Sequence, residues 1–149
     1  MIIFDIDGVL ADTSYKEKRF LKGKKYSEIN WGLFFQDAIY DLPIKAGILV
    51  AKAIINFLPQ TEILFLTARG ESVRNMTLHW LSEHLQIEKE RIDLTMRPED
   101  NFSDSITFKE EVGNEIGFNN IDLVFEDNPE IVNMWRSHNV ICYQTLGVI

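Results

Sequence analysis

Cysteine is almost absent from the sequence, and this scarcity excludes two kinds of stabilising site. Cys142 is the only cysteine among 149 residues, so no disulfide can form within the chain. A zinc site of cysteine and histidine is also excluded, because the three histidines have no ligand-like spacing with Cys142. Such sparing use of cysteine suits a reducing compartment, and we expect a cytoplasmic location.

The sequence also lacks a long apolar run and an excess of basic residues. No window approaches the roughly 20 apolar residues that span a membrane. The first ten residues carry acids and no basic flank, so we expect no signal peptide there. The 23 acidic residues outnumber the 15 basic ones and give a net charge of -8. This balance argues against a broad nucleic-acid-binding surface, which is normally basic.

What the sequence contains is sufficient for one globular domain. Its length, with 46% hydrophobic and 26% charged residues, predicts a single domain over residues 1–149. Strand-like and helix-like segments alternate along the chain. This alternation predicts a three-layer, Rossmann-like α/β fold with a central, mainly parallel five-stranded sheet.

Short apolar runs bounded by turn-forming residues predict the strands. They are the opening run and residues 62–67, 91–96, 121–125 and 140–144. Helical spacing and helix signals predict helices over residues 45–58, 71–86, 107–117 and 129–138. We expect the first helix to be well buried, because it is apolar nearly all round. Thr107 and Glu110 have the form of a capping box, and Asn128 is the expected cap of the last helix.

Residues 12–43 interrupt this alternation and are too short for a second domain. We expect a minimal cap insertion with one or two short helices over the end of the first strand. Six of the 15 basic residues fall within it, namely Lys16, Lys18, Arg19, Lys22, Lys24 and Lys25. Such a run usually forms a solvated surface. Its closeness to the acidic strand end leaves open that it attracts an anionic substrate.

The opening stretch joins an apolar strand to two carboxylates. Asp5 and Asp7 follow residues 1–4, with one apolar residue between them, and Gly8 breaks the run. Two acids this close repel each other, and burial penalises their charge, unless a cation joins them. Mg²⁺ is the simplest candidate, because it prefers oxygen ligands. An acidic turn after a strand is the plain alternative.

Further polar residues follow other predicted strands or begin a predicted helix. They are Thr67 and Arg69, then Lys109, then Glu126 and Asp127. Ligands of parallel sheets bind beyond the carboxyl ends of the strands, so we expect these residues to meet Asp5 and Asp7 there. Each has an ordinary alternative role as a helix cap or a solvated side chain. Their joint arrival at one edge of the sheet favours a functional site.

In this order, Asp5-Ile-Asp7-Gly8-Val9, Thr67, Lys109 and Glu126-Asp127 resemble the four motifs of haloacid dehalogenase-like (HAD) phosphohydrolases. One branch is more similar, the 3′-phosphatase domain of phage polynucleotide kinases and its free-standing relatives. That likeness includes residues 66–72, 96–98, 108–111, 125–127 and 132–136, and it runs over nearly the whole chain.

The sequence departs from this branch in three places. It has no Gly-x-x-x-x-Gly-Lys-Ser/Thr phosphate loop, so we expect no kinase half in this sequence. Val9 stands where the family usually has threonine. Tyr15 and Lys16 stand where free-standing relatives often have a histidine-arginine pair, which weakens the transfer of substrate identity.

The resemblance implies a Mg²⁺-dependent phosphomonoesterase. Asp5 would be the nucleophile that forms an aspartyl-phosphate, and Asp7 would give and take the proton. The implied Mg²⁺ site comprises Asp5, the backbone carbonyl of Asp7, and Asp127, with Glu126 acting on a metal-bound water.

The resemblance also assigns residues to the phosphate and to the rest of the substrate. Thr67 would donate its hydroxyl to a phosphate oxygen, and Lys109 would hold the phosphate and offset the carboxylates. Gly8 lets the chain turn sharply beside the metal. Arg69 and Arg97 are candidates for gripping the substrate, and a surface ion pair is the alternative for each.

The expected substrate is a phosphorylated nucleotide or oligonucleotide end, and no protein partner is expected. A small-molecule nucleotidase of the same superfamily is an open alternative. A signalling receiver domain is disfavoured, because a receiver carries its phosphate-accepting aspartate on a middle strand. An inactive HAD-like binding module is disfavoured too, because all motif residues are present.

Overall fold

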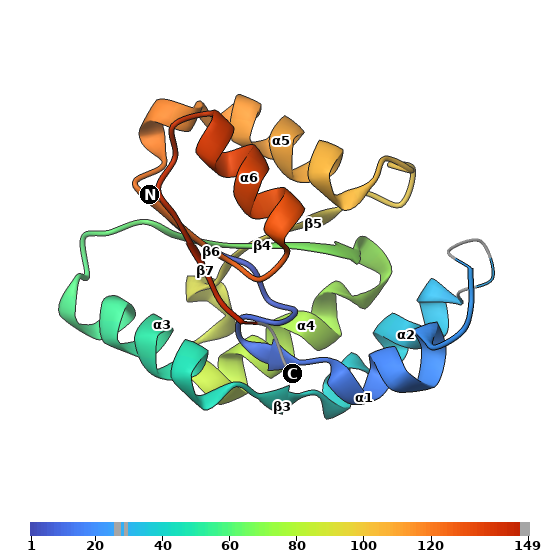
Figure 1. Ribbon diagram of the computed structural model, residues 1–149. Helices are drawn as coiled ribbons and strands as arrows, with labels where there is room; N and C mark the ends of the chain where they lie inside the picture. Colours follow the sequence, from blue (N-terminus) through green and yellow to red (C-terminus); the bar gives the residue numbers. More distant parts are fainter. Residues whose placement is uncertain (26–27, 29, 147–149) are drawn as a thin grey trace.

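The computed structural model describes residues 1–25, 28 and 30–146, which form a three-layer α/β fold (Figure 1). The strands of the main sheet are β1 (Ile2–Phe4), β4 (Ile63–Gly70), β5 (Asp93–Arg97), β6 (Leu123–Glu126) and β7 (Cys142–Gln144). All neighbours pair in parallel, in the order β5-β4-β1-β6-β7. The predicted fold class and five-stranded sheet are confirmed.

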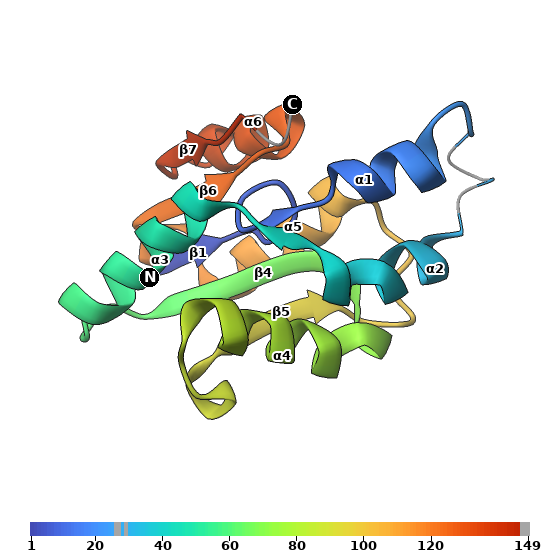
Figure 2. The ribbon, with the colours of Figure 1, turned by 90° about the horizontal axis from the view of Figure 1, so that it is seen from below.

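Helices cover both faces of this sheet (Figures 1 and 2). One face carries α3 (Lys45–Phe57) and α4 (Arg74–Leu85), and the other carries α5 (Ser105–Ile116) and α6 (Pro129–Ser137). Alternate side chains of a strand point to opposite faces. Phe4 therefore joins the core that includes Trp80 of α4, while Ile3 joins the core that includes Trp135 of α6. The two cores hold β1 at the centre of the domain.

The prediction of a well-buried helix over residues 45–58 is wrong. Ala51 is the one fully buried residue of α3, while Leu49 is 69% exposed and Phe57 is 82% exposed. The helix lies in an outer layer, so only one side packs against the sheet. Apolar residues on its other side therefore face solvent.

The two predicted helix caps have different outcomes. The Asp104 carboxylate accepts the backbone N–H of Thr107 at 2.8 Å, so α5 begins at Ser105. The predicted capping box of Thr107 and Glu110 is therefore wrong, because an earlier acid takes the capping bond. The Asn128 side chain accepts the backbone N–H of Glu130 at 2.9 Å, as predicted for α6.

The described residues of the insertion form short helical segments and a small sheet of their own. Its elements are β2 (Ala11–Asp12), α1 (Ser14–Lys16), the π-helical η1 (Glu17–Leu21), α2 (Trp31–Gln36), the 3₁₀ turn η3 (Asp37–Tyr40) and β3 (Leu42–Pro43). Antiparallel pairing of β2 with β3 closes the insertion at its base. Sequence periodicity could not reveal strands of two residues. Three further 3₁₀ turns are η4 (Glu71–Val73), η5 (Lys89–Arg91) and η6 (Phe118–Asn120).

In the part of the chain that the structure describes, no helix combines the length and the apolar character that a bilayer crossing requires.

Candidate active site

A buried lysine joins two of the predicted acids. Lys109 Nζ donates to Asp5 Oδ1 at 2.8 Å and to Glu126 Oε2 at 2.6 Å. The other oxygen of Glu126 accepts the backbone N–H groups of Asp127 and Asn128, each at 3.1 Å. The carboxylate of Glu126 is thus fixed on both oxygens. Distant parts of the chain meet here as the sequence predicts.

Asp127 adds a third carboxylate to the two that Lys109 contacts. Oxygen atoms of Asp5, Glu126 and Asp127 all lie within 4.8 Å of one another. Burial, reinforced by the charge of Glu126, raises the pKa of Asp5 well above its ordinary value. Burial and the same neighbour raise the pKa of Asp127 to about 7. Burial is the larger cause of both shifts, and the negative charge of Glu126 adds to it.

The donor set of this cluster fits a hard divalent cation. All three acids offer carboxylate oxygens, which Mg²⁺ prefers over nitrogen or sulfur. A bound cation would balance part of the negative charge of the three carboxylates. Asp5 and Asp127 could bind such a cation, because Glu126 is already held by Lys109 and two backbone N–H groups.

Gly8 makes room for one of these acids. Its backbone has φ +79°, a conformation that residues with a Cβ rarely adopt. A Cβ atom at this position would lie 2.0 Å from Asp127 Oδ2. Any side chain at position 8 would therefore displace the Asp127 carboxylate.

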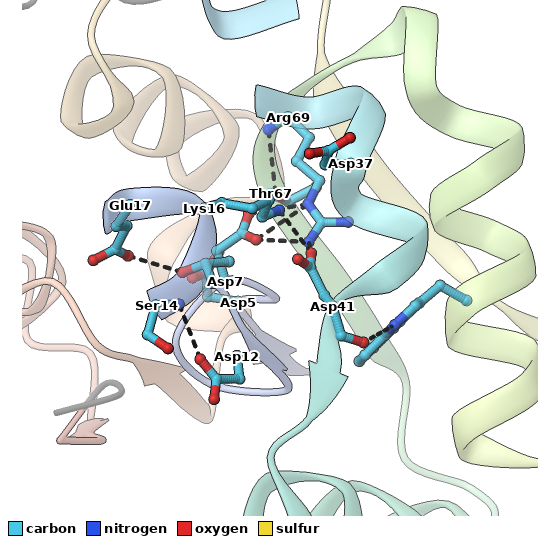
Figure 3. Close-up of polar contacts among 12 residues, drawn as sticks. Asp5, Asp7, Asp12, Ser14, Lys16, Glu17, Asp37, Asp41, Thr67 and Arg69 are labelled. Atoms are coloured by element: carbon cyan, nitrogen blue, oxygen red, sulfur yellow. Dashed lines mark hydrogen bonds and ion pairs between the residues drawn. The ribbon is translucent and has the colours of Figure 1, made fainter. Parts of the chain in front are cut away.

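Asp7 is held by an arginine rather than by the lysine (Figure 3). Arg69 Nη2 donates to Asp7 Oδ1 at 2.6 Å, and Arg69 Nε donates to Asp7 Oδ2 at 3.0 Å. Burial by itself raises the pKa of Asp7, but the charge and hydrogen bonds of Arg69 outweigh it and hold this pKa below its ordinary value. The Thr67 hydroxyl lies 3.5 Å from Asp7 Oδ2. Thr67 is thus placed at the same edge as both aspartates.

The two arginines expected to grip the substrate lie in different surroundings. The Arg69 side chain is fully buried and also donates to Asp41 Oδ2 at 2.9 Å. These bonds support Asp7, and Arg69 also lines the cleft described below. Arg97 donates to Ser105 Oγ at 3.1 Å and lines an adjoining groove.

A cleft opens over this group of residues. It has a volume of about 240 Å³ and is lined by Asp5, Asp7, Lys109, Glu126 and Asp127 on the side of the sheet. The insertion supplies Thr13, Glu17, Leu21 and Phe34 on the other side. A groove of about 450 Å³ shares Ala68 and Ser105 with the cleft and is also lined by Arg97 and Phe102. The two spaces therefore adjoin.

The structure places two charged residues, Lys16 and Asp41, behind the site, a position that the sequence analysis predicted for neither. Lys16 Nζ donates to Asp41 Oδ2 at 2.7 Å, and both side chains are fully buried. Lys16 therefore does not belong to a solvated basic surface, unlike the five other basic residues of that run, which are exposed. No sequence signal links a lysine and an aspartate 25 positions apart.

Comparison with a known family gives a match over almost the whole chain. The family described as the polynucleotide kinase PNKP phosphatase domain matches residues 1–146. Comparison with curated proteins gives no match.

Several solved structures share the fold. A chain in the "Structure of Pnkp1/Rnl/Hen1 complex" is 23% identical, with a TM-score of 0.65, over 96% of this chain and 44% of that chain. This protein therefore spans less than half the length of that relative. The class C acid phosphatase from Bacillus anthracis is 18% identical, with a TM-score of 0.61, over 97% of this chain and 65% of that one. A family IA HAD hydrolase from Entamoeba histolytica is 13% identical, with a TM-score of 0.59, over 95% and 81% of the two chains.

Proposed function

This chain belongs to the polynucleotide kinase PNKP phosphatase domain family and is a HAD-type phosphatase, and from this premise we propose that it removes 3′-phosphates from polynucleotide or nucleotide ends with Mg²⁺. One observation carries the proposal: Lys109 joins Asp5 and Glu126 in the same cleft as Asp7 and Asp127. Phosphoryl transfer depends chiefly on positioning and on neutralising charge, and this cleft offers both.

In the first half-reaction, a carboxylate oxygen of Asp5 attacks the phosphorus atom. A bond forms between Asp5 and phosphorus as the bond from phosphorus to the leaving oxygen breaks. Asp7 gives its proton to that oxygen, so the product leaves as an alcohol. Arg69 favours the ionised form of Asp7, but a dianionic phosphate beside Asp7 raises its pKa and so favours the protonated form.

In the second half-reaction, water hydrolyses the aspartyl-phosphate. The ionised Asp7 takes a proton from the water as the water oxygen bonds to phosphorus. The bond between Asp5 and phosphorus then breaks, releasing inorganic phosphate and restoring the Asp5 carboxylate. Asp7 thus ends the cycle protonated and ready for the next leaving group.

The divalent cation and the lysine divide the work of neutralising charge. When bound by Asp5, Asp127 and the backbone carbonyl of Asp7, Mg²⁺ would supply positive charge for the transferring phosphoryl group. Lys109 holds Asp5 in place and offsets part of the carboxylate charge before substrate arrives. Thr67 would donate its hydroxyl to a phosphate oxygen, and Glu126 would hold a water near the cation.

The groove beside the cleft supports a substrate larger than phosphate. Because both spaces share Ala68 and Ser105, a nucleoside attached to the phosphate can extend toward Arg97 and Phe102. Phe102 is 92% exposed and offers a ring on which a base can stack. We also propose that the exposed basic residues 18–25 attract the anionic end of a nucleic acid.

The small volume of the reaction cleft favours one alternative, a nucleotidase that acts on mononucleotides. A screen would compare nucleoside 3′- and 5′-monophosphates with 3′- and 5′-phosphorylated oligonucleotides in the presence of Mg²⁺, with Asp5→Asn as the blank. We expect the highest kcat/KM for 3′-phosphorylated oligonucleotides. Faster turnover of mononucleotides would support the alternative, and release of phosphate by Asp5→Asn at the wild-type rate would contradict the mechanism.

A further inference from the structure

We propose that Asp41 and Lys16 of the insertion are positioning residues that act through Arg69 to hold Asp7 in its reactive orientation. The inference rests on the proposed function, in which Asp7 protonates the leaving oxygen. Neither Asp41 nor Lys16 touches the reaction cleft's acids directly. Their influence passes through the single guanidinium group between them and Asp7 (Figure 3).

The guanidinium of Arg69 is bound on both sides. Toward the cleft, its Nε and Nη2 atoms donate to the two oxygens of Asp7. Toward the insertion, the same Nη2 donates to Asp41 Oδ2 at 2.9 Å. Lys16 Nζ donates to that same oxygen at 2.7 Å. A displacement of Asp41 would therefore change the orientation of the group that holds Asp7.

Asp41 is itself anchored to the core of the domain. Its backbone carbonyl accepts the indole N–H of Trp80 at 2.8 Å, and Trp80 is only 2% exposed. Besides its bond to Asp41, Lys16 contacts the insertion, since its ammonium lies 4.7 Å from the centroid of the Phe34 ring. The orientation of Arg69 thus depends on helix α4 and on the insertion together.

The pattern of exposure points to a role in the site rather than in stability alone. The side chains of Lys16, Asp41 and Arg69 have no exposed surface, whereas the Asp7 side chain is 28% exposed. Of these four side chains, only Asp7 is accessible to solvent. Arg69 Nη1 and Asp41 Oδ1 are buried without a hydrogen-bond partner, so the group does not maximise its own bonding. Its geometry instead directs one edge of the guanidinium at Asp7.

The leaving group of the substrate separates positioning from general stability. The alkoxide leaving group of a 3′-phosphorylated oligonucleotide needs a proton, whereas p-nitrophenolate leaves readily without one. Loss of Asp7 orientation should therefore reduce kcat/KM for the oligonucleotide far more than for p-nitrophenyl phosphate. Damage to Asp5, to the cation site or to folding should reduce both alike.

The test uses the full chain with Mg²⁺ and three variants behind the site. For Asp41→Asn we expect kcat/KM on the oligonucleotide to fall at least about tenfold, because a positioned acid contributes on the order of 10²–10⁴-fold. The loss of kcat/KM on p-nitrophenyl phosphate should stay below about threefold, because p-nitrophenolate needs no proton to leave. Lys16→Met should also lower the ratio of kcat/KM for the oligonucleotide to kcat/KM for p-nitrophenyl phosphate. Lys16→Arg should keep this ratio at the wild-type value.

Asp37→Asn is the matched control. Asp37 lies in the same insertion and pairs with the exposed Arg19 at 2.9 Å rather than with Arg69. This variant should leave the ratio of the two substrates unchanged. Equal losses on both substrates in Asp41→Asn, or none on either, would overturn the inference. If Asp41→Asn fails to fold by circular dichroism, Lys16→Met decides between the same outcomes.

Asp7→Asn distinguishes a failure of this inference from a failure of the proposed function. If Asp7→Asn shows the leaving-group effect and folded Asp41→Asn does not, the positioning role is wrong and the mechanism stands. If kcat/KM of Asp7→Asn falls equally on both substrates, the acid role of Asp7 is wrong and the inference fails with it, because kcat/KM excludes the later hydrolysis step that both substrates share.

Discussion

Lys109 Nζ lies 2.8 Å from Asp5 Oδ1, although the two residues are 104 positions apart in the sequence. Both side chains are almost fully buried, at 3% and 8% exposure. Removing one partner of a buried ion pair leaves an uncompensated charge, which is costly. This contact therefore gives a direct test of the cleft.

Lys109→Met should abolish phosphatase activity and lower the free energy of unfolding by about 3 kcal/mol, because Asp5 and Glu126 lose their shared cation. Urea denaturation and p-nitrophenyl phosphate turnover would measure the two effects. The exposed Lys89 serves as control, and Lys89→Met should match the wild type in both. A Lys109→Met protein with normal turnover would contradict the proposed site.

Mg²⁺ should stabilise the folded protein, because the carboxylates of Asp5 and Asp127 are brought together only on folding. At about 100 times the dissociation constant, a ligand of the folded state alone adds about 2.7 kcal/mol. Differential scanning fluorimetry with and without Mg²⁺ would show a rise of several degrees in Tm. Asp127→Asn should remove most of this rise, whereas Asn at the exposed Asp100 should keep it. Equal shifts in both variants would argue against the site.

Gly8→Ala should inactivate the enzyme, because the new Cβ would overlap the Asp127 carboxylate. Gly23 provides a matched control, since it has a similar φ of +75° but nothing within 4 Å of its Cβ position. Both variants carry backbone strain of about 1 kcal/mol. Only Gly8→Ala should also lose the thermal shift with Mg²⁺. Loss of that shift in Gly23→Ala as well would assign the effect to strain alone.

Phe102→Ala should raise KM for a 3′-phosphorylated oligonucleotide, because base stacking on an aromatic ring contributes about 1–3 kcal/mol. Its KM for p-nitrophenyl phosphate should change little. Phe57 on α3 is 82% exposed and does not line the cleft or the groove, so Phe57→Ala serves as control. If the two variants behave alike, the groove does not bind the nucleoside.

Burial raises the pKa of the Cys142 thiol to about 12, with a smaller contribution from the charge of Glu126. An unfolded thiol titrates near 8.5, so the folded protein binds this proton more tightly. Stability from this group is therefore complete below about pH 8.5 and declines as the pH rises toward 12. Unfolding curves at pH 8 and 10 should diverge for the wild type and converge for Cys142→Ala. The native thiol should also resist alkylation at pH 8.5.

The sequence was sufficient to predict the sheet and the convergence of the acids. Parallel strands deliver their carboxyl ends to one edge, so Asp5 and Glu126 were expected to meet there, with Lys109 beside them near the start of a helix. This depends only on topology, which the alternation of strands and helices indicates. The geometry of the structure agrees with that placement.

The interior of the insertion could not be predicted in the same way. Lys16 stood in a basic run and looked solvated, yet it is buried against Asp41. Periodicity carries no information about an ion pair between two loop-like segments, and the two-residue strands that close the insertion leave no pattern. Similarly, the outer face of α3 has the composition of a core helix. Its exposure depends on which elements lie outside it, and that is a tertiary property.

The central position of β1 has a consequence for how the protein matures. Ile2 pairs with Ile63 on one side and with Leu123 on the other. During translation the first strand therefore leaves the ribosome long before its second neighbour is made. Contacts so distant in sequence form slowly, and partly made chains expose unpaired strand edges. Catalytic competence would arrive only after Glu126 and Asp127 have been made, so nascent chains that lack these residues should release no phosphate.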